Sequence, residues 1–116
     1  MTDLFIKPEA LKEIRTIIKN IYPKATVWAY GSRVGGDAHS GSDLDLAVKS
    51  FGQENARVDD LREALRESGV PFLIDIFEFD RLPLSFQKEI MKKYVVVYDG
   101  EALVEEKVAR DSTSDR

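Results

Sequence analysis

The sequence predicts a single α/β (α+β) domain in which helices flank a small mixed sheet of three or four strands. One observation is that segments with apolar residues every three or four positions alternate with short runs of β-branched and aromatic residues. The other is the size: 116 residues, 43% hydrophobic and 33% charged, suffice for one core. We expect residues 1–100 to form the domain and the polar residues 101–116 to form a flexible tail.

The first predicted helix spans residues 8–22, followed by a strand over residues 26–31. Apolar residues recur in the helix at spacings of three and four: Leu11, Ile14, Ile18 and Ile21. Pro8 suits a first helical turn and Pro23 a helix end. The strand, "TVWAYG", is rich in β-branched and aromatic residues and ends in a glycine that favours a turn.

A second strand and a second helix follow a segment rich in glycine and serine. Residues 43–48, "DLDLAV", alternate as a strand does, and residues 54–68 contain a helical stripe. That stripe consists of Val58, Leu61 and Leu65, and Gly69 stands where a helix stop is expected.

The last third of the chain predicts a strand, a short helix and a final strand. Residues 71–79, "PFLIDIFEF", are so apolar that we expect this strand to be buried on both faces, which makes Asp75 conspicuous. A helix over about 83–93 and a strand over 94–98 complete the domain.

Composition excludes several classes of function. The net charge of −4, with no concentrated basic patch, argues against direct nucleic-acid binding. The absence of cysteine excludes disulfides and thiolate metal sites. No apolar run reaches the length of a signal peptide or a membrane span, so we expect a cytoplasmic protein without membrane contact.

Two aspartates predict a metal site. Side chains two positions apart on a strand project to the same face, so Asp43 and Asp45 point together while Leu44 points away. Two neighbouring carboxylates repel each other and lose hydration unless a cation compensates them. Oxygen ligands suit Mg²⁺ or Mn²⁺ better than zinc, and Asp75 is the natural third ligand.

The turn upstream of these aspartates suits a phosphate group. Gly31 and Ser32 end a strand, and the residues after them can open a short helix whose free amide groups receive an anion. Ser32 adds a hydroxyl and Arg33 a permanent cation. Ser42 suits a phosphate contact and a backbone hydrogen bond before the strand equally well. Phosphate donors beside paired carboxylates indicate phosphoryl or nucleotidyl transfer.

Two other motifs are excluded at identifiable positions. The spacing from Gly31 to Gly36 is that of a P-loop, but Asp37 and Ala38 replace the required Lys-Ser/Thr pair. A calcium loop beginning at Asp43 would have Ala47 and Val48 where a ligand and the turn glycine belong.

The stretch "GSRVGGDAHSGSDLDLAV" resembles the Gly-Ser, then Asp-x-Asp signature of the DNA polymerase beta-like nucleotidyltransferases. In size the chain is similar to the minimal nucleotidyltransferase (MNT) domain, and the resemblance extends from the first helix to the last strand. Many relatives carry a second arginine where this chain has Gly35, which leaves Arg33 as the local cation.

This resemblance implies the polymerase beta-like fold and the antitoxin half of a HEPN/MNT toxin–antitoxin module. Such an antitoxin transfers AMP from ATP to a tyrosine hydroxyl of its HEPN ribonuclease partner and releases pyrophosphate. The implied catalytic and metal-binding residues are Asp43, Asp45 and Asp75, with two Mg²⁺ ions as cofactor. The implied nucleotide-binding residues are Gly31, Ser32, Arg33 and Ser42.

Two alternatives remain open at this stage. One is an inactive fold that neutralises its partner by contact alone, and the other is nucleotidyl transfer to a small molecule. Among single residues, we interpret His39 as solvated, and Trp28 and Tyr30 as packing residues of the core or a partner interface.

Overall fold

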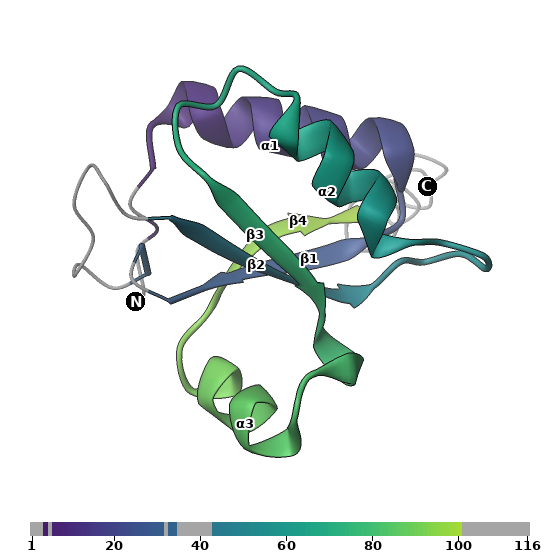
Figure 1. The fold of residues 1–116 in the computed structure, drawn as a ribbon, viewed down its shortest axis with the longest axis vertical. Coiled ribbons are helices and arrows are strands. Elements are labelled where there is room, and N and C mark those ends of the chain that lie inside the picture. Colours follow the sequence, from purple (N-terminus) through teal and green to yellow (C-terminus); the bar gives the residue numbers. More distant parts are fainter. Residues whose placement is uncertain (1–3, 5, 32, 35–42, 101–116) are drawn as a thin grey trace, which may run out of the picture.

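The computed structural model describes residues 4, 6–31, 33–34 and 43–100. Within them it contains one four-stranded sheet, three α-helices and a short 3₁₀ helix (Figure 1). In chain order the elements are α1 (Pro8–Ile21), β1 (Thr26–Tyr30), β2 (Leu44–Ser50), α2 (Val58–Arg66), β3 (Ile74–Glu78), η1 (Phe79–Arg81), α3 (Leu84–Lys92) and β4 (Val95–Asp99).

The sheet is mixed and has the order β3-β2-β1-β4. β1 pairs antiparallel with both β2 and β4, whereas β2 pairs parallel with β3. A parallel pair requires a crossover connection, and α2 provides it between β2 and β3. The predicted α+β class, with a small mixed sheet flanked by helices, is confirmed.

The helices divide between the two sides of the sheet. α1 and α2 cover one side, which we call the core face, and α3 lies on the other side, which we call the site face (Figure 1). Alternate β2 residues Leu44, Leu46 and Val48 are buried on the core face, against Ile14 and Ile18 of α1 and leucines of α2. Most of the apolar burial that stabilises the fold therefore lies on this face.

The start of α2 has no side-chain cap of its own and is hydrogen-bonded instead by Tyr22, the residue that follows α1. The Tyr22 hydroxyl accepts a hydrogen bond from the Arg57 backbone N–H at 2.8 Å and donates one to the Asp60 carboxylate. Asn55 lies in the left-handed region, with φ 61°, so the chain turns before it enters the helix. This explains why α2 begins at Val58, four residues after the predicted start.

The expectation that residues 71–79 form a strand buried on both faces is wrong. β3 is an edge strand, so its outer backbone edge has no partner in the described sheet. Ile76 is fully buried on the core face, but Phe77 on the site face is 42% exposed. Apolar composition could not distinguish these cases, because an edge strand with one packed face also contains many apolar residues.

A smaller cluster joins α3 to the site face. Trp28 of β1 stacks on Tyr94, with ring centroids 4.1 Å apart, and makes an edge contact with Phe79. Ile90 of α3 and Ala47 of β2 complete this cluster.

Among the described residues, no helix is both long enough and apolar enough to cross a bilayer.

Candidate active site

Three polar residues form one row across the site face. Asp45 of β2 pairs with Asp75 of β3 in the parallel register and with Tyr30 of β1 in the antiparallel register. Paired residues project to the same side of a sheet, so the three side chains share the site face. The structure therefore brings together Asp45 and Asp75, which lie 30 positions apart in the sequence.

Asp43 lies just before β2 and is exposed. Its charge acts on Asp45, whose pKa is raised by partial burial first, then by the Asp75 carboxylate, then by the Asp43 carboxylate. Among the described residues, none of these three aspartates forms an ion pair. The site face thus carries negative charge that no described cation neutralises.

The described residues contain no ready metal site. No group of three or more Asp, Glu, His or Cys side chains within this part of the chain lies close enough to hold an ion. The donor set nevertheless fits a hard divalent cation, because it consists of carboxylate oxygens that repel one another.

Gly31 approaches the Asp45 carboxylate so closely that a side chain at this position would have to displace it. An added Cβ atom would overlap the Oδ2 atom of Asp45. Its φ of +84° also lies in the left-handed region, which glycine adopts at little cost. The turn after β1 is therefore packed against the central carboxylate of the row.

Several predicted site residues lie outside the described part of the chain. Ser32 and Ser42, the two serines assigned to phosphate contacts, are among them, as are Gly35 and His39. Of the short helix expected after Gly31 and Ser32, the structure describes only residues 33 and 34, which form a turn and a β-bridge from Val34 to Leu4 instead; the rest lies outside the described residues.

Arg33 is placed beside the start of β3. It is 6% exposed, and its guanidinium carbon lies 4.2 Å from the centre of the Phe72 ring, a cation–π contact. Phe72 packs against the core under α1 and α2. The phosphate role of Arg33 stays a prediction, and the described geometry also assigns it a packing contact.

Tyr30 is the site residue that sequence reasoning assigned to packing alone. Burial, together with the charges of Asp45 and Asp75, raises the pKa of its hydroxyl to about 12. Its ring makes an edge contact with Phe86 of α3, with centroids 5.7 Å apart. The sequence contained one sign that Tyr30 belongs to the site: it stands at the end of a strand, directly before the Gly-Ser turn.

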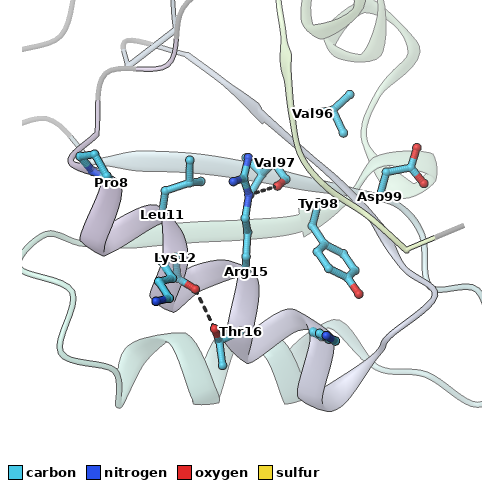
Figure 2. Close-up of a pocket in the computed structure, with 10 residues that line it drawn as sticks. Pro8, Leu11, Lys12, Arg15, Thr16, Val96, Val97, Tyr98 and Asp99 are labelled. Carbon is cyan, nitrogen blue, oxygen red and sulfur yellow. Dashed lines mark hydrogen bonds between the residues drawn. The ribbon is translucent and has the colours of Figure 1, made fainter. Parts of the chain in front are cut away.

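Two cavities help to locate the site. The larger, about 710 Å³, lies between α1 and β4, where the Arg15 Nε donates to the Val97 carbonyl at 2.8 Å (Figure 2). It contains none of the three aspartates. A cavity of about 390 Å³ lies between the end of β1 and the end of α3 and is lined by Tyr30 and Gly31. None of the three aspartates lines this second cavity either, and it adjoins the acidic row only through Tyr30. Asp75 lines a further cavity of about 500 Å³ between α2 and β3. We therefore place the candidate site at the row itself, with the Tyr30 cavity on its β1 side.

Comparison with known proteins defines the family. The family model described as "Polymerase beta, Nucleotidyltransferase" matches residues 12–102, most of the chain. The chain belongs to the polymerase beta nucleotidyltransferase family. The matched span of this nucleotidyltransferase includes the Gly31 turn and all three aspartates.

One curated relative and one solved structure are similar over nearly their whole length. The nucleotidyltransferase is 40% identical over 107 residues to the "Probable protein adenylyltransferase MntA" of Haemophilus influenzae, covering 91% of this chain and 94% of that protein. Its fold is similar to that of a solved structure described as "Crystal structure of the toxin-antitoxin with AMP-PNP", with a TM-score of 0.62 and 16% sequence identity. That match covers 89% of this chain and 87% of the other.

The order of the strands separates two sides of the site. β2 lies between β1 and β3, so Gly31 flanks Asp45 on one side and Asp75 flanks it on the other. In nucleotidyl transfer the leaving and attacking oxygens lie on opposite sides of the phosphorus atom. The row therefore offers separate places for the two reactants.

Proposed function

We propose that this nucleotidyltransferase transfers AMP from ATP to a tyrosine hydroxyl of a HEPN toxin and so acts as the toxin's antitoxin. The observation that carries the proposal is the row in which Asp45 faces Asp75 while Gly31 packs against the Asp45 carboxylate. The likeness to a protein named as an adenylyltransferase supports AMP as the transferred group. The toxin–antitoxin structure of the same fold supports a toxin as partner.

We assign ATP to the β1 side of Asp45. The turn at Gly31 and Ser32 would bind the β and γ phosphates through backbone amides, with Arg33 and Ser42 as further phosphate contacts. Because Gly31 has no side chain, the backbone of this turn can approach a phosphate closely.

We assign Asp43, Asp45 and Asp75 as the residues that hold Mg²⁺. Their oxygen donors and their mutual repulsion fit a hard divalent cation. When bound, Mg²⁺ supplies positive charge at the phosphate oxygens as the leaving group departs. Mn²⁺, which also prefers oxygen ligands, is expected to substitute.

The acceptor hydroxyl approaches from the β3 side, next to Asp75. A bond forms between the hydroxyl oxygen and the α phosphorus, and the bond from that phosphorus to the bridging oxygen breaks. The leaving pyrophosphate takes the electron pair, and the Asp75 carboxylate takes the proton. Asp75 is exposed on an edge strand, so an acceptor carried on another protein can reach it.

The same edge suits contact with a protein. Phe77 lies two residues after Asp75 on the site face and is 42% exposed. A partner that covers Phe77 removes apolar surface from water while it presents a side chain to Asp75. We place the reaction in the cytoplasm.

The test is transfer of label from α-labelled ATP. The chain is incubated with Mg²⁺ and the HEPN protein encoded beside its gene, and modified residues are identified by mass spectrometry. We expect AMP on a toxin tyrosine, no labelling of a toxin in which that tyrosine is phenylalanine, and no labelling by Asp43→Ala/Asp45→Ala.

Each alternative predicts a different result. A non-catalytic antitoxin would neutralise the toxin without ATP, and the double aspartate variant would protect cells as well as the wild type does. Transfer to a small molecule would leave the toxin unlabelled in the presence of active enzyme. Either result would overturn the proposal.

A further inference from the structure

The leaving phosphates call for positive charge beyond Arg33, the one charged residue that the structure describes in the Gly31 turn. The three aspartates concentrate negative charge where a triphosphate, itself an anion, is proposed to bind. Arg33 is nearly fully buried with its guanidinium over Phe72.

The end of α3 lies beside the Gly31 turn because of strand pairing. β4 runs antiparallel to β1, so the start of β4 lies next to the end of β1. Lys92 and Lys93 lie at the C-terminal end of α3, separated from that start by one residue. These lysines, with Phe86 and Glu89, line the same cavity as Tyr30 and Gly31, which we call the α3 groove.

The two lysines differ in their partners. The Lys92 ammonium forms an exposed ion pair with Glu89, at 3.0 Å. Lys93 is exposed and forms no ion pair with any described residue. Of the two, Lys93 is therefore the cation that can bind an incoming anion without first losing a partner.

The α3 groove also lies on the appropriate side of the site. It adjoins β1, whereas Asp75 lies across β2 on β3. A hydroxyl that attacks from the β3 side drives the leaving group toward the β1 side. The groove is thus where a departing pyrophosphate would meet protein.

We propose that the α3 groove is a subsite for the β and γ phosphates of the nucleotide, and that Lys93 is its cation, with Lys92 as a weaker contributor. The proposal rests on the proposed function, because it takes ATP as the substrate. Phe86 and Tyr30 form the apolar floor that keeps the lysine stem close to Gly31.

The test compares the affinities of three nucleotides for the wild type and lysine variants. Loss of a charge-assisted contact weakens binding by about tenfold. We expect Lys93→Ala to weaken ATP binding by about this factor while AMP binding is unchanged, since AMP lacks the β and γ phosphates. ADP should show an intermediate loss, and Lys93→Arg should restore most of the ATP affinity.

Lys88→Ala is the matched control. Lys88 is an exposed lysine of α3 that does not line the groove, so its removal changes net charge equally. Equal ATP affinities for Lys93→Ala and Lys88→Ala, or an equal loss of ATP and AMP binding in Lys93→Ala, would overturn the subsite. These results leave the proposed function intact if the wild type still labels the toxin, whereas a wild type that binds no ATP contradicts the proposed function itself.

Discussion

The two faces of the sheet use the same strands for different purposes. On the core face Leu44, Leu46 and Ile76 are fully buried. On the site face, the alternate positions Asp45 and Asp75 hold carboxylates that repel each other. Buried apolar contacts are concentrated on the core face and the candidate site lies on the other face, so substitutions one residue apart should separate stability from activity.

The largest effect is expected from Asp45→Asn on transfer activity. The substitution keeps the shape of the side chain but removes the central charge of the row, and loss of such an electrostatic group reduces kcat by up to about 10³-fold. The fold should survive, since the core face is untouched. Initial rates with labelled ATP measure kcat, and far-ultraviolet circular dichroism measures whether the fold is retained. A variant that keeps more than about a tenth of wild-type kcat contradicts the assignment of Asp45.

The adjacent substitution Leu46→Ala should have the opposite profile. It removes a fully buried side chain from the core face, which costs about 2–5 kcal/mol of unfolding free energy. Folded molecules at low temperature should retain near-normal KM for ATP. Urea unfolding and KM are measured on the same sample; a normal unfolding midpoint would show that the core face tolerates the cavity.

At Gly31, stability and activity are not expected to separate. The new methyl group would overlap the Asp45 carboxylate and impose a strained positive φ, which costs about 1–3 kcal/mol. Stability and transfer should therefore fall together. Thermal unfolding and rate measurements check this, and a loss of stability with full activity would mean that the turn does not support the site.

Tyr30→Phe should affect the site without affecting the packing. The ring contact with Phe86 is kept, while the hydroxyl that shares the site face with Asp45 and Asp75 is lost. Loss of one neutral hydrogen-bonding group changes rates by about three- to tenfold. Steady-state kinetics measure this change, and Trp28→Phe, whose ring lies at the Tyr94 stack, serves as a packing control.

The smallest effect is a pH dependence of stability that originates at Asp45. The pKa of Asp45 in the folded chain is raised above its ordinary value of 3.8, mainly by burial and then by Asp75. A raised pKa means that this group's contribution to stability is fully present below pH 3.8 and is lost as pH rises through the folded-state pKa. In EDTA at pH 7, Asp45→Asn should therefore be more stable than the wild type, and the difference should disappear below pH 3.8. Urea titrations at several pH values test the sign.

Part of the site was predictable because it depends on local geometry. Alternation along a strand separates Asp45 from Leu44 and Leu46 wherever the strand lies. A lone acid in an apolar run made Asp75 conspicuous, and its position opposite Asp45 agrees with the expected convergence. The roles of these residues, and of Ser32 and Ser42, remain predictions.

What the sequence alone determined is the type and order of the elements and the family to which the chain belongs, because periodicity and motif spacing are properties of neighbouring residues. Only the tertiary structure decided that β3 is an edge strand, that Tyr30 joins the acidic row, and that Lys93 and Gly31 line one cavity. These facts depend on which strands pair and in what register. Pairing is decided by contacts between residues far apart in the chain, and the local pattern of a strand is compatible with more than one neighbour.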